Sequence, residues 1–136
     1  MSPSLIFAPM GALAFLTFLV LLLIPVRRFR AAAAGHVKAE DFRFGESAAV
    51  PGAVSIPNRN YMNLLELPML FYVAGLMYYV ADRVDGTVLA TAWAYVVLRA
   101  LHSAVHLTYN NVIHRLSLFA LSNVALIAFW ALFFLR

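Results

Sequence analysis

The block Leu5–Val26 constrains this chain most, because its 22 consecutive residues carry no charged side chain. As a helix the block is about 33 Å long, enough to cross the hydrocarbon core of a bilayer. Of the 136 residues, 64% are hydrophobic and 12% are charged, whereas a soluble domain has roughly half and a quarter. The apolar residues form continuous blocks rather than alternating, which excludes a porin-like barrel. The sequence therefore predicts an all-α membrane protein.

Three further apolar blocks follow, so we predict one membrane domain over residues 1–136, folded as a bundle of four transmembrane helices. The spans are expected at about residues 5–27, 58–81, 87–109 and 113–135. The short turns Asp82–Gly86 and Asn110–Asn111 favour antiparallel helix pairs. The polar stretch 28–57 is expected to be a loop with a short turn around Asp41–Phe44. A signal peptide is disfavoured because positive charges follow the first block instead of preceding it.

The basic residues are unevenly distributed around these spans. The net charge is +4, and the bias of membrane proteins toward positive cytoplasmic loops explains it without nucleic acid as a partner. Seven basic residues lie in the first and third loops: Arg27, Arg28, Arg30, Lys38, Arg43, Arg59 and Arg115. Only Arg83 and Arg136 lie on the opposite side. We therefore expect loops one and three in the cytoplasm and both termini outside.

Two stripes of polar residues interrupt the second and third spans. Helical spacing places each stripe on one face: Arg59, Asn63 and Glu66 in the second span, and Arg99, His102, His106 and Tyr109 in the third. A charge in mid-bilayer costs about 2.5 kcal/mol or more, so such residues face a bundle interior, an oligomer interface or a wet cavity. We predict that the two stripes line a polar pocket that opens at the cytoplasmic end of the bundle.

Two simpler interpretations of the stripes stand beside the pocket. Glu66 and Arg99 could neutralise each other as a structural ion pair, but that pair leaves the other polar residues of the stripes unexplained. His102 and His106, with Glu66, have the spacing of metal ligands. Because the neighbouring arginines oppose a cation, no metal is expected there.

The segment Arg59–Glu66, with the sequence RNYMNLLE and followed by Pro68, resembles the signature of the MAPEG family, the membrane-associated proteins in eicosanoid and glutathione metabolism. The family pattern is an Arg, an Asn four residues later and a Glu three further on. The third-span stripe and the arginine cluster at 27–30 resemble the family too, as does Arg115 at the start of the fourth span. The similarity covers the whole chain in length, number of spans and placement of polar residues.

The resemblance implies a homotrimer that binds glutathione, as co-substrate, between neighbouring subunits near the cytoplasmic face. It implies that Arg115 is the catalytic residue, because family members hold the glutathione thiolate with an arginine at this position. The residues that it implies for glutathione binding are Arg28, Arg59, Asn63, Glu66, Arg99, His102 and His106. Since the protein has no cysteine, glutathione would supply the nucleophilic sulfur.

The expected function is that of a glutathione-dependent membrane transferase, which conjugates a lipophilic electrophile or reduces a lipophilic peroxide arriving from the membrane lipids. The alternative is a non-catalytic scaffold or accessory subunit of a larger membrane complex with the same fold. Compared with the mammalian synthases, Pro68 lies one residue nearer Glu66, His106 replaces a tyrosine, and the first loop is longer. These departures suggest a bacterial-type member, located in the inner membrane.

Overall fold

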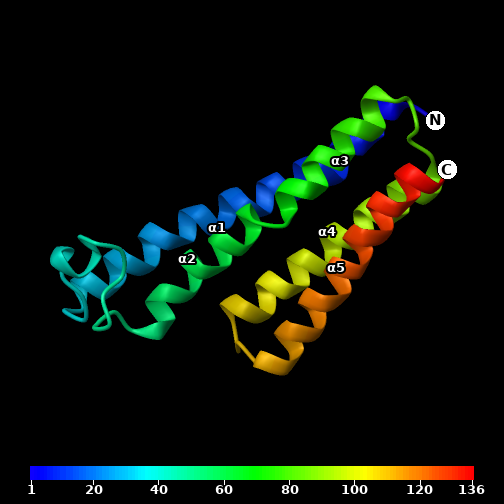
Figure 1. The fold of residues 1–136 in the computed structure, drawn as a ribbon. Coiled ribbons are helices and arrows are strands. Elements are labelled where there is room, and N and C mark those ends of the chain that lie inside the picture. Colours follow the sequence, from blue (N-terminus) through cyan, green and yellow to red (C-terminus); the bar gives the residue numbers. More distant parts are fainter.

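The computed structural model describes residues 1–136, and the chain is helical, without β-sheet (Figure 1). Two short 3₁₀ helices, η1 (Pro3–Ile6) and η2 (Ala39–Phe42), accompany five α-helices. These are α1 (Phe7–Ala33), α2 (Gly52–Leu65), α3 (Pro68–Val80), α4 (Gly86–Leu107) and α5 (Val112–Leu135). The all-helical class predicted from composition is confirmed.

The helices form four segments that are long and apolar enough to cross a membrane. They cover Pro3–Ala33, Gly52–Val80, Gly86–Leu107 and Val112–Leu135. The segments run antiparallel, with both termini at one end of the bundle (Figure 1). The opposite end carries loop one (residues 34–51) and the turn between α4 and α5, and we call it the loop end. The chain is thus a multi-pass membrane protein.

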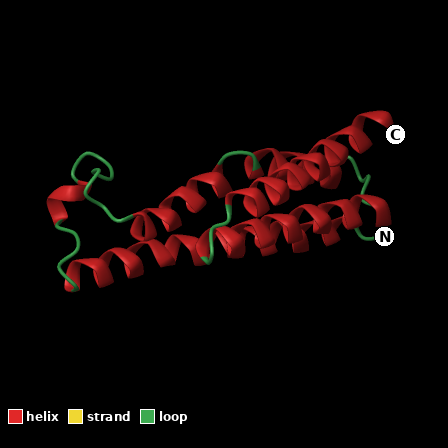
Figure 2. Cartoon of the chain, turned by 90° about the horizontal axis from the view of Figure 1, so that it is seen from below, coloured by secondary structure: helices red, strands yellow, loops and turns green.

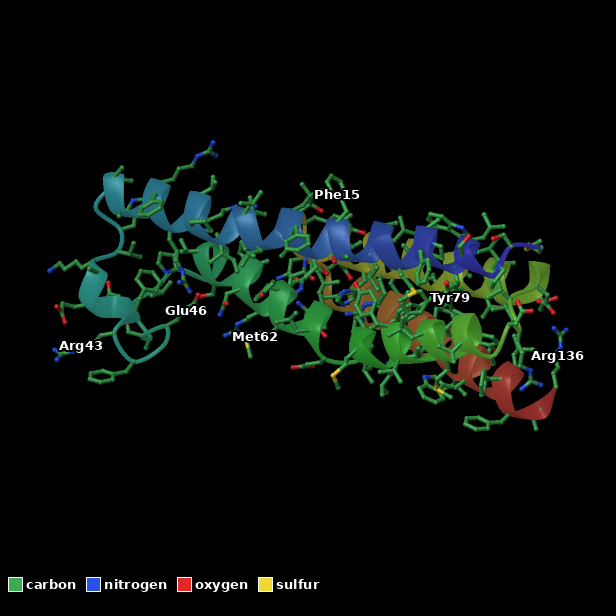
Figure 3. All side chains as sticks on the ribbon, turned by 90° about the horizontal axis from the view of Figure 1, so that it is seen from above. Phe15, Arg43, Glu46, Met62, Tyr79 and Arg136 are labelled. Atoms are coloured by element: carbon green, nitrogen blue, oxygen red, sulfur yellow. The ribbon has the colours of Figure 1, made fainter.

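The outer surface of the bundle is apolar, as a lipid environment requires. Phe15 and Phe18 are each 63% exposed on α1, and Ile127 is 68% exposed on α5. The side chain of Phe15 points away from the other helices (Figure 3). Water would penalise so many exposed large apolar side chains, whereas lipid tails solvate them.

Aromatic side chains from three helices fill the centre of the bundle. The Phe71 ring lies 4.9 Å from the Tyr95 ring and 5.4 Å from the Phe129 ring, measured between centroids. Tyr78 packs on Phe129 and donates its hydroxyl to the Phe129 carbonyl oxygen at 2.8 Å. This packing ties α3, α4 and α5 together and satisfies the one polar atom that Tyr78 buries.

The second span is not the single helix expected over residues 58–81. It consists of α2 and α3, which are separated by Glu66 and Leu67 (Figure 1). Pro68 explains the break, because its ring nitrogen has no hydrogen to donate to the carbonyl four residues earlier. Glu66 donates its own N–H to the Met62 carbonyl at 3.2 Å and then leaves the helical conformation, with ψ −99°.

At the loop end, loop one projects beyond the α4–α5 turn (Figure 1 and Figure 2). Helix α1 continues to Ala33, past the expected end of the first span, and α2 begins at Gly52, before the expected start of the second. Loop one folds back on these extensions through the small apolar cluster Ala31, Val37, Val50 and Val54. The short turn expected around residues 41–44 is the 3₁₀ helix η2.

Candidate polar pocket at the loop end

A pocket of about 530 Å³ opens between α2, α4 and α5 at the loop end. Its wall mixes polar and apolar side chains, contributed by Gly52, Ser55, Ile56, Arg59, Asn63, His102, His106, Asn110, Val112, Arg115, Leu116 and Phe119. Two of these residues are arginines and none is a carboxylate. A concave wall of this charge attracts anions.

Five of the eight residues predicted from the sequence to form the site line this pocket. They come from all three helices and are Arg59, Asn63, His102, His106 and Arg115. The break after α2 and the end of α4 place these residues around one opening, although they are far apart in the chain.

Arg99 lies directly behind the pocket wall and is fully buried. Its Nη2 donates to the Asn63 carbonyl oxygen at 2.9 Å, while its Nε and Nη1 are buried without a partner. The guanidinium carbon is 5.7 Å from the ring centroid of Phe119, which lines the pocket. Arg99 makes no ion pair. An anion in the pocket would compensate this charge.

The ion pair between Glu66 and Arg99, considered as a structural alternative, does not form. Glu66 is exposed at the break between α2 and α3 and does not line the pocket. Within one protomer, the charge of Arg99 therefore has no direct carboxylate partner.

His102 and His106 are 2% and 4% exposed, and their ring centroids are 5.9 Å apart. The Nδ1 atoms of both rings are buried without a hydrogen-bond partner. No third side chain of a metal-ligating type completes a group with them. The two imidazoles thus offer hydrogen-bonding capacity to a polar ligand.

The third-span stripe is shorter than expected, because Tyr109 does not belong to it. Helix α4 ends at Leu107, and Thr108 turns the chain away with ψ −104°. Tyr109 is 62% exposed, and its hydroxyl lies 2.9 Å from Nδ1 of His114 on the outside of the turn.

Arg115 is positioned by the turn that starts α5. Its Nη1 donates to Oδ1 of Asn110 at 2.7 Å. Asn110 has φ +48°, a left-handed conformation that asparagine tolerates. Oδ1 of Asn111 caps α5 by accepting the N–H groups of Ile113 and His114, both at 3.0 Å. Arg115 thus lies in the first turns of α5, whose positive dipole end adds to the preference for an anion.

Arg28 lies outside the polar pocket, on the side of α1 that faces loop one. Its Nη2 is 3.1 Å from Oε1 of Glu46, and its guanidinium carbon is 4.5 Å from the ring centroid of Phe42. Glu46 extends from loop one toward the adjoining ends of α1 and α2 (Figure 3). Within one protomer, Arg28 thus joins loop one to α1 and does not contact the pocket.

Sequence reasoning missed two structural residues beside the pocket. The sequence marks Arg27 as a positive charge and as part of the arginine cluster at 27–30, but gives no sign that it donates to the carbonyls of Ala53 at 3.1 Å and Leu107 at 3.4 Å. It thus joins α1 to α2 and α4. Asn60 is fully buried and accepts from Ser103 Oγ at 3.2 Å. The one sequence feature that indicates an inward-facing Asn60 is its position three residues, or about one helical turn, before Asn63.

The four spans and the positively charged pocket define an integral membrane protein with a polar site at one end of its helical bundle. Within that class the family is clear, because the MAPEG family profile matches residues 6–135. The chain belongs to the MAPEG family, and the resemblance seen in its polar stripes is confirmed over nearly the whole length. No curated protein and no solved structure gives a significant match to the chain.

Proposed function

We propose that this MAPEG protein is a glutathione-dependent membrane transferase that works as a homotrimer and binds glutathione in the polar pocket. The observation that carries the proposal is the charge of the pocket. Arg59 and Arg115 lie in its wall without a carboxylate, and Arg99 lies behind it without a counterion. Glutathione carries two carboxylates, which arginines bind well through paired hydrogen bonds.

Each wall residue has a role suited to one part of the tripeptide. Arg59 binds the carboxylates, Arg99 compensates their charge from behind the wall, and Asn63 bonds the peptide groups. Nδ1 atoms of His102 and His106 complete the polar wall. Glu66 binds the ammonium, and its exposed position suits a ligand shared between subunits. Arg28 does not line the pocket of its own protomer, so a contact with glutathione requires a neighbouring subunit.

Arg115 is the proposed catalytic residue. Its positive charge lowers the pKa of the bound glutathione thiol, and the thiol proton leaves to water at the loop end. The thiolate then attacks the electrophilic carbon of a lipophilic substrate. A carbon–sulfur bond forms, and the displaced group leaves with the electron pair of the bond that breaks.

The fold suits a reaction between a water-soluble and a membrane-soluble reactant. The pocket opens at the loop end, which the excess of basic residues predicts to be cytoplasmic, and the cytoplasm would supply the glutathione. The apolar outer faces of α1 and α5 lie in the bilayer, from which the electrophile arrives.

Calorimetric titration of glutathione into the detergent-solubilised protein tests this function. We expect saturable binding at millimolar concentration or below, and weaker but measurable binding of S-methylglutathione, which keeps both carboxylates but cannot form the thiolate that Arg115 stabilises. Arg59→Ala should weaken binding, whereas Arg43→Ala, which removes an exposed charge outside the pocket, should not. Absence of binding would instead favour the non-catalytic scaffold. The mass of the protein in native mass spectrometry tests the trimer separately.

A further inference from the structure

A second hollow, of about 480 Å³, lies between the last turns of α1 and the 3₁₀ helix η2. We call it the α1 groove. Its wall is mostly apolar and contains two cationic side chains, and the side chains that define it are Ile24, Pro25, Phe29, Phe42, Arg28 and Lys38. The α1 groove and the polar pocket have no lining residue in common.

The α1 groove crosses the level at which the first span leaves the membrane. The uncharged block ends at Val26 and Arg27 follows it, so Ile24 and Pro25 lie in the last apolar turn of α1. Ala32, which also lines the groove, lies about 12 Å further along the helix axis. The groove therefore begins among the lipid tails and ends at the depth of the headgroups.

The charges of the α1 groove are those of a site for an anion. Its lining contains Arg28 and Lys38 and no carboxylate. Glu46 occupies Nη2 of Arg28, but Nε of the same guanidinium is buried without a partner. Lys38 is exposed and makes no ion pair. One cationic group in the groove is thus free, and the other retains an unused donor.

The surface beside the groove has the composition of a membrane interface. Phe29 is 74% exposed and Phe44 is 92% exposed, and both lie next to basic residues, Arg30 and Arg43. Aromatic and basic side chains together are typical of segments at the headgroup level. Basic clusters directly beside a transmembrane helix attract anionic lipids.

A mostly apolar groove that contains two cationic side chains matches an amphiphile with an anionic head and an apolar tail. We propose that the α1 groove binds one anionic phospholipid, with an acyl chain against Ile24, Pro25 and Phe29 and the phosphate beside Arg28 and Lys38. The lipid then links α1 to loop one, in addition to the small cluster around Val37 and Val50 and the contacts of Arg28 with Glu46 and Phe42. The polar pocket contributes no lining residue to this site, and Arg28 is the one residue that both proposals involve.

Native mass spectrometry of the full chain tests the lipid site. The protein is released from mixed micelles that contain equal amounts of phosphatidylglycerol and phosphatidylcholine with identical acyl chains. We expect one phosphatidylglycerol to be retained in preference to phosphatidylcholine. Lys38→Glu should reduce that preference about fivefold or more, because the attraction of one basic residue to an anionic lipid surface has about this size.

Two kinds of variant separate the groove from general charge attraction. Ala32→Phe fills the groove without changing the charge and should also abolish the preference. Ala39→Phe, placed on the opposite wall, repeats that test should the first variant fold poorly by circular dichroism. Arg43→Glu makes the same charge change as Lys38→Glu, but on a 69% exposed side chain outside the groove, and should lower the preference much less.

Three results would overturn the lipid site. The first is equal retention of the two lipids by the unaltered protein. The second is an undiminished preference in the variants at Lys38 and Ala32. The third is an equal loss in Arg43→Glu and Lys38→Glu, which would mean that anionic lipids are held by diffuse attraction and not by the α1 groove.

Discussion

The Arg99 guanidinium donates from Nη2 to the backbone carbonyl oxygen of Asn63 at 2.9 Å, and this bond joins the polar stripes of two spans. Asn63 lies in the last turn of α2, where carbonyl groups lack partners within the helix. Pro68 causes that helix end, so the proline creates the acceptor that Arg99 uses. The break in the second span and the buried arginine are therefore two parts of one arrangement.

Arg99→Met should leave the ligand-free protein at least as stable as the original. A hydrogen bond from a charged group contributes about 1.5–3 kcal/mol, whereas burying an unpaired charge costs several kcal/mol. Methionine fills much of the same volume without that cost. The melting temperature in detergent should be unchanged or higher, while glutathione should no longer raise it.

Arg99→Lys is the matched control, because lysine keeps the charge but lacks the guanidinium fork. It should give no gain in melting temperature. If Arg99→Met melts several degrees below the original protein, the charge of Arg99 is not uncompensated. Such a result would point to a further partner of Arg99 in the assembled protein.

Arg115→Ala should abolish formation of the glutathione thiolate. In the proposed complex the Arg115 guanidinium is the charge nearest to the glutathione sulfur. Without it, the thiol returns to its ordinary pKa. The ultraviolet thiolate absorbance that appears on adding glutathione should disappear at neutral pH, although the tripeptide still binds through its carboxylates.

The control for this variant is Arg83→Ala, at the opposite end of the bundle, where Arg83 donates to the Phe133 carbonyl at 3.0 Å. The thiolate signal should persist there. An undiminished signal in Arg115→Ala, with binding intact, would remove the catalytic role from Arg115.

Arg27→Met should destabilise the loop end. Arg27 donates to the carbonyls of Ala53 and Leu107, at 3.1 and 3.4 Å, and so holds the start of α2 and the end of α4 against α1. Losing charged hydrogen bonds of this kind costs about 1.5–3 kcal/mol each, less where water replaces the donor. The melting temperature should fall, whereas Arg30→Met, in the same cluster but exposed, should leave it unchanged. Equal effects of the two variants would contradict the bridging role.

The membrane class and the inward positions of Arg99, His102 and His106 were predictable from the sequence, because both follow from local periodicity and from the cost of charge in lipid. Glu66 was expected on the same face as Arg59 and Asn63, but it is exposed at the helix break and does not line the pocket. Helical spacing predicted that Arg59 and Asn63 share one face and that His102 and His106 share another, and the packing of α2 on α4 places all four around the pocket. The partners of Arg27 and Arg28 were not predictable. Backbone carbonyls carry no sequence signature, and the pairing of Arg28 with Glu46 depends on how loop one folds back.

The break in the second span shows a different limit of sequence reasoning. Pro68 was visible, but the apolar pattern continues through it, and a proline in a transmembrane helix often leaves the helix continuous. Tyr109 was likewise placed on the third-span stripe by its spacing. The end of α4 at Leu107 moves it to the surface.

Pro68→Ala tests whether the break in the second span serves the pocket. With an N–H at residue 68, the backbone can donate a hydrogen bond to the Leu64 carbonyl oxygen, and the helix can continue. The Asn63 carbonyl oxygen then accepts the N–H of Leu67. Arg99 then loses its one acceptor, and glutathione binding should weaken. Because the protein has no cysteine, spin labels on cysteines at Ala53 and Val80 report the bend directly. Their distance should lengthen toward about 40 Å, the rise of 27 residues in a straight helix.

Pro57→Ala is the control for this last variant, since Pro57 lies inside α2, where the helix continues unbroken. It should change neither the label distance nor the binding of glutathione. A longer distance in Pro68→Ala with unchanged binding would show that the break does not serve the pocket. The free carbonyl of Asn63 would then be only a consequence of the helix end, without a role in holding Arg99 for its ligand.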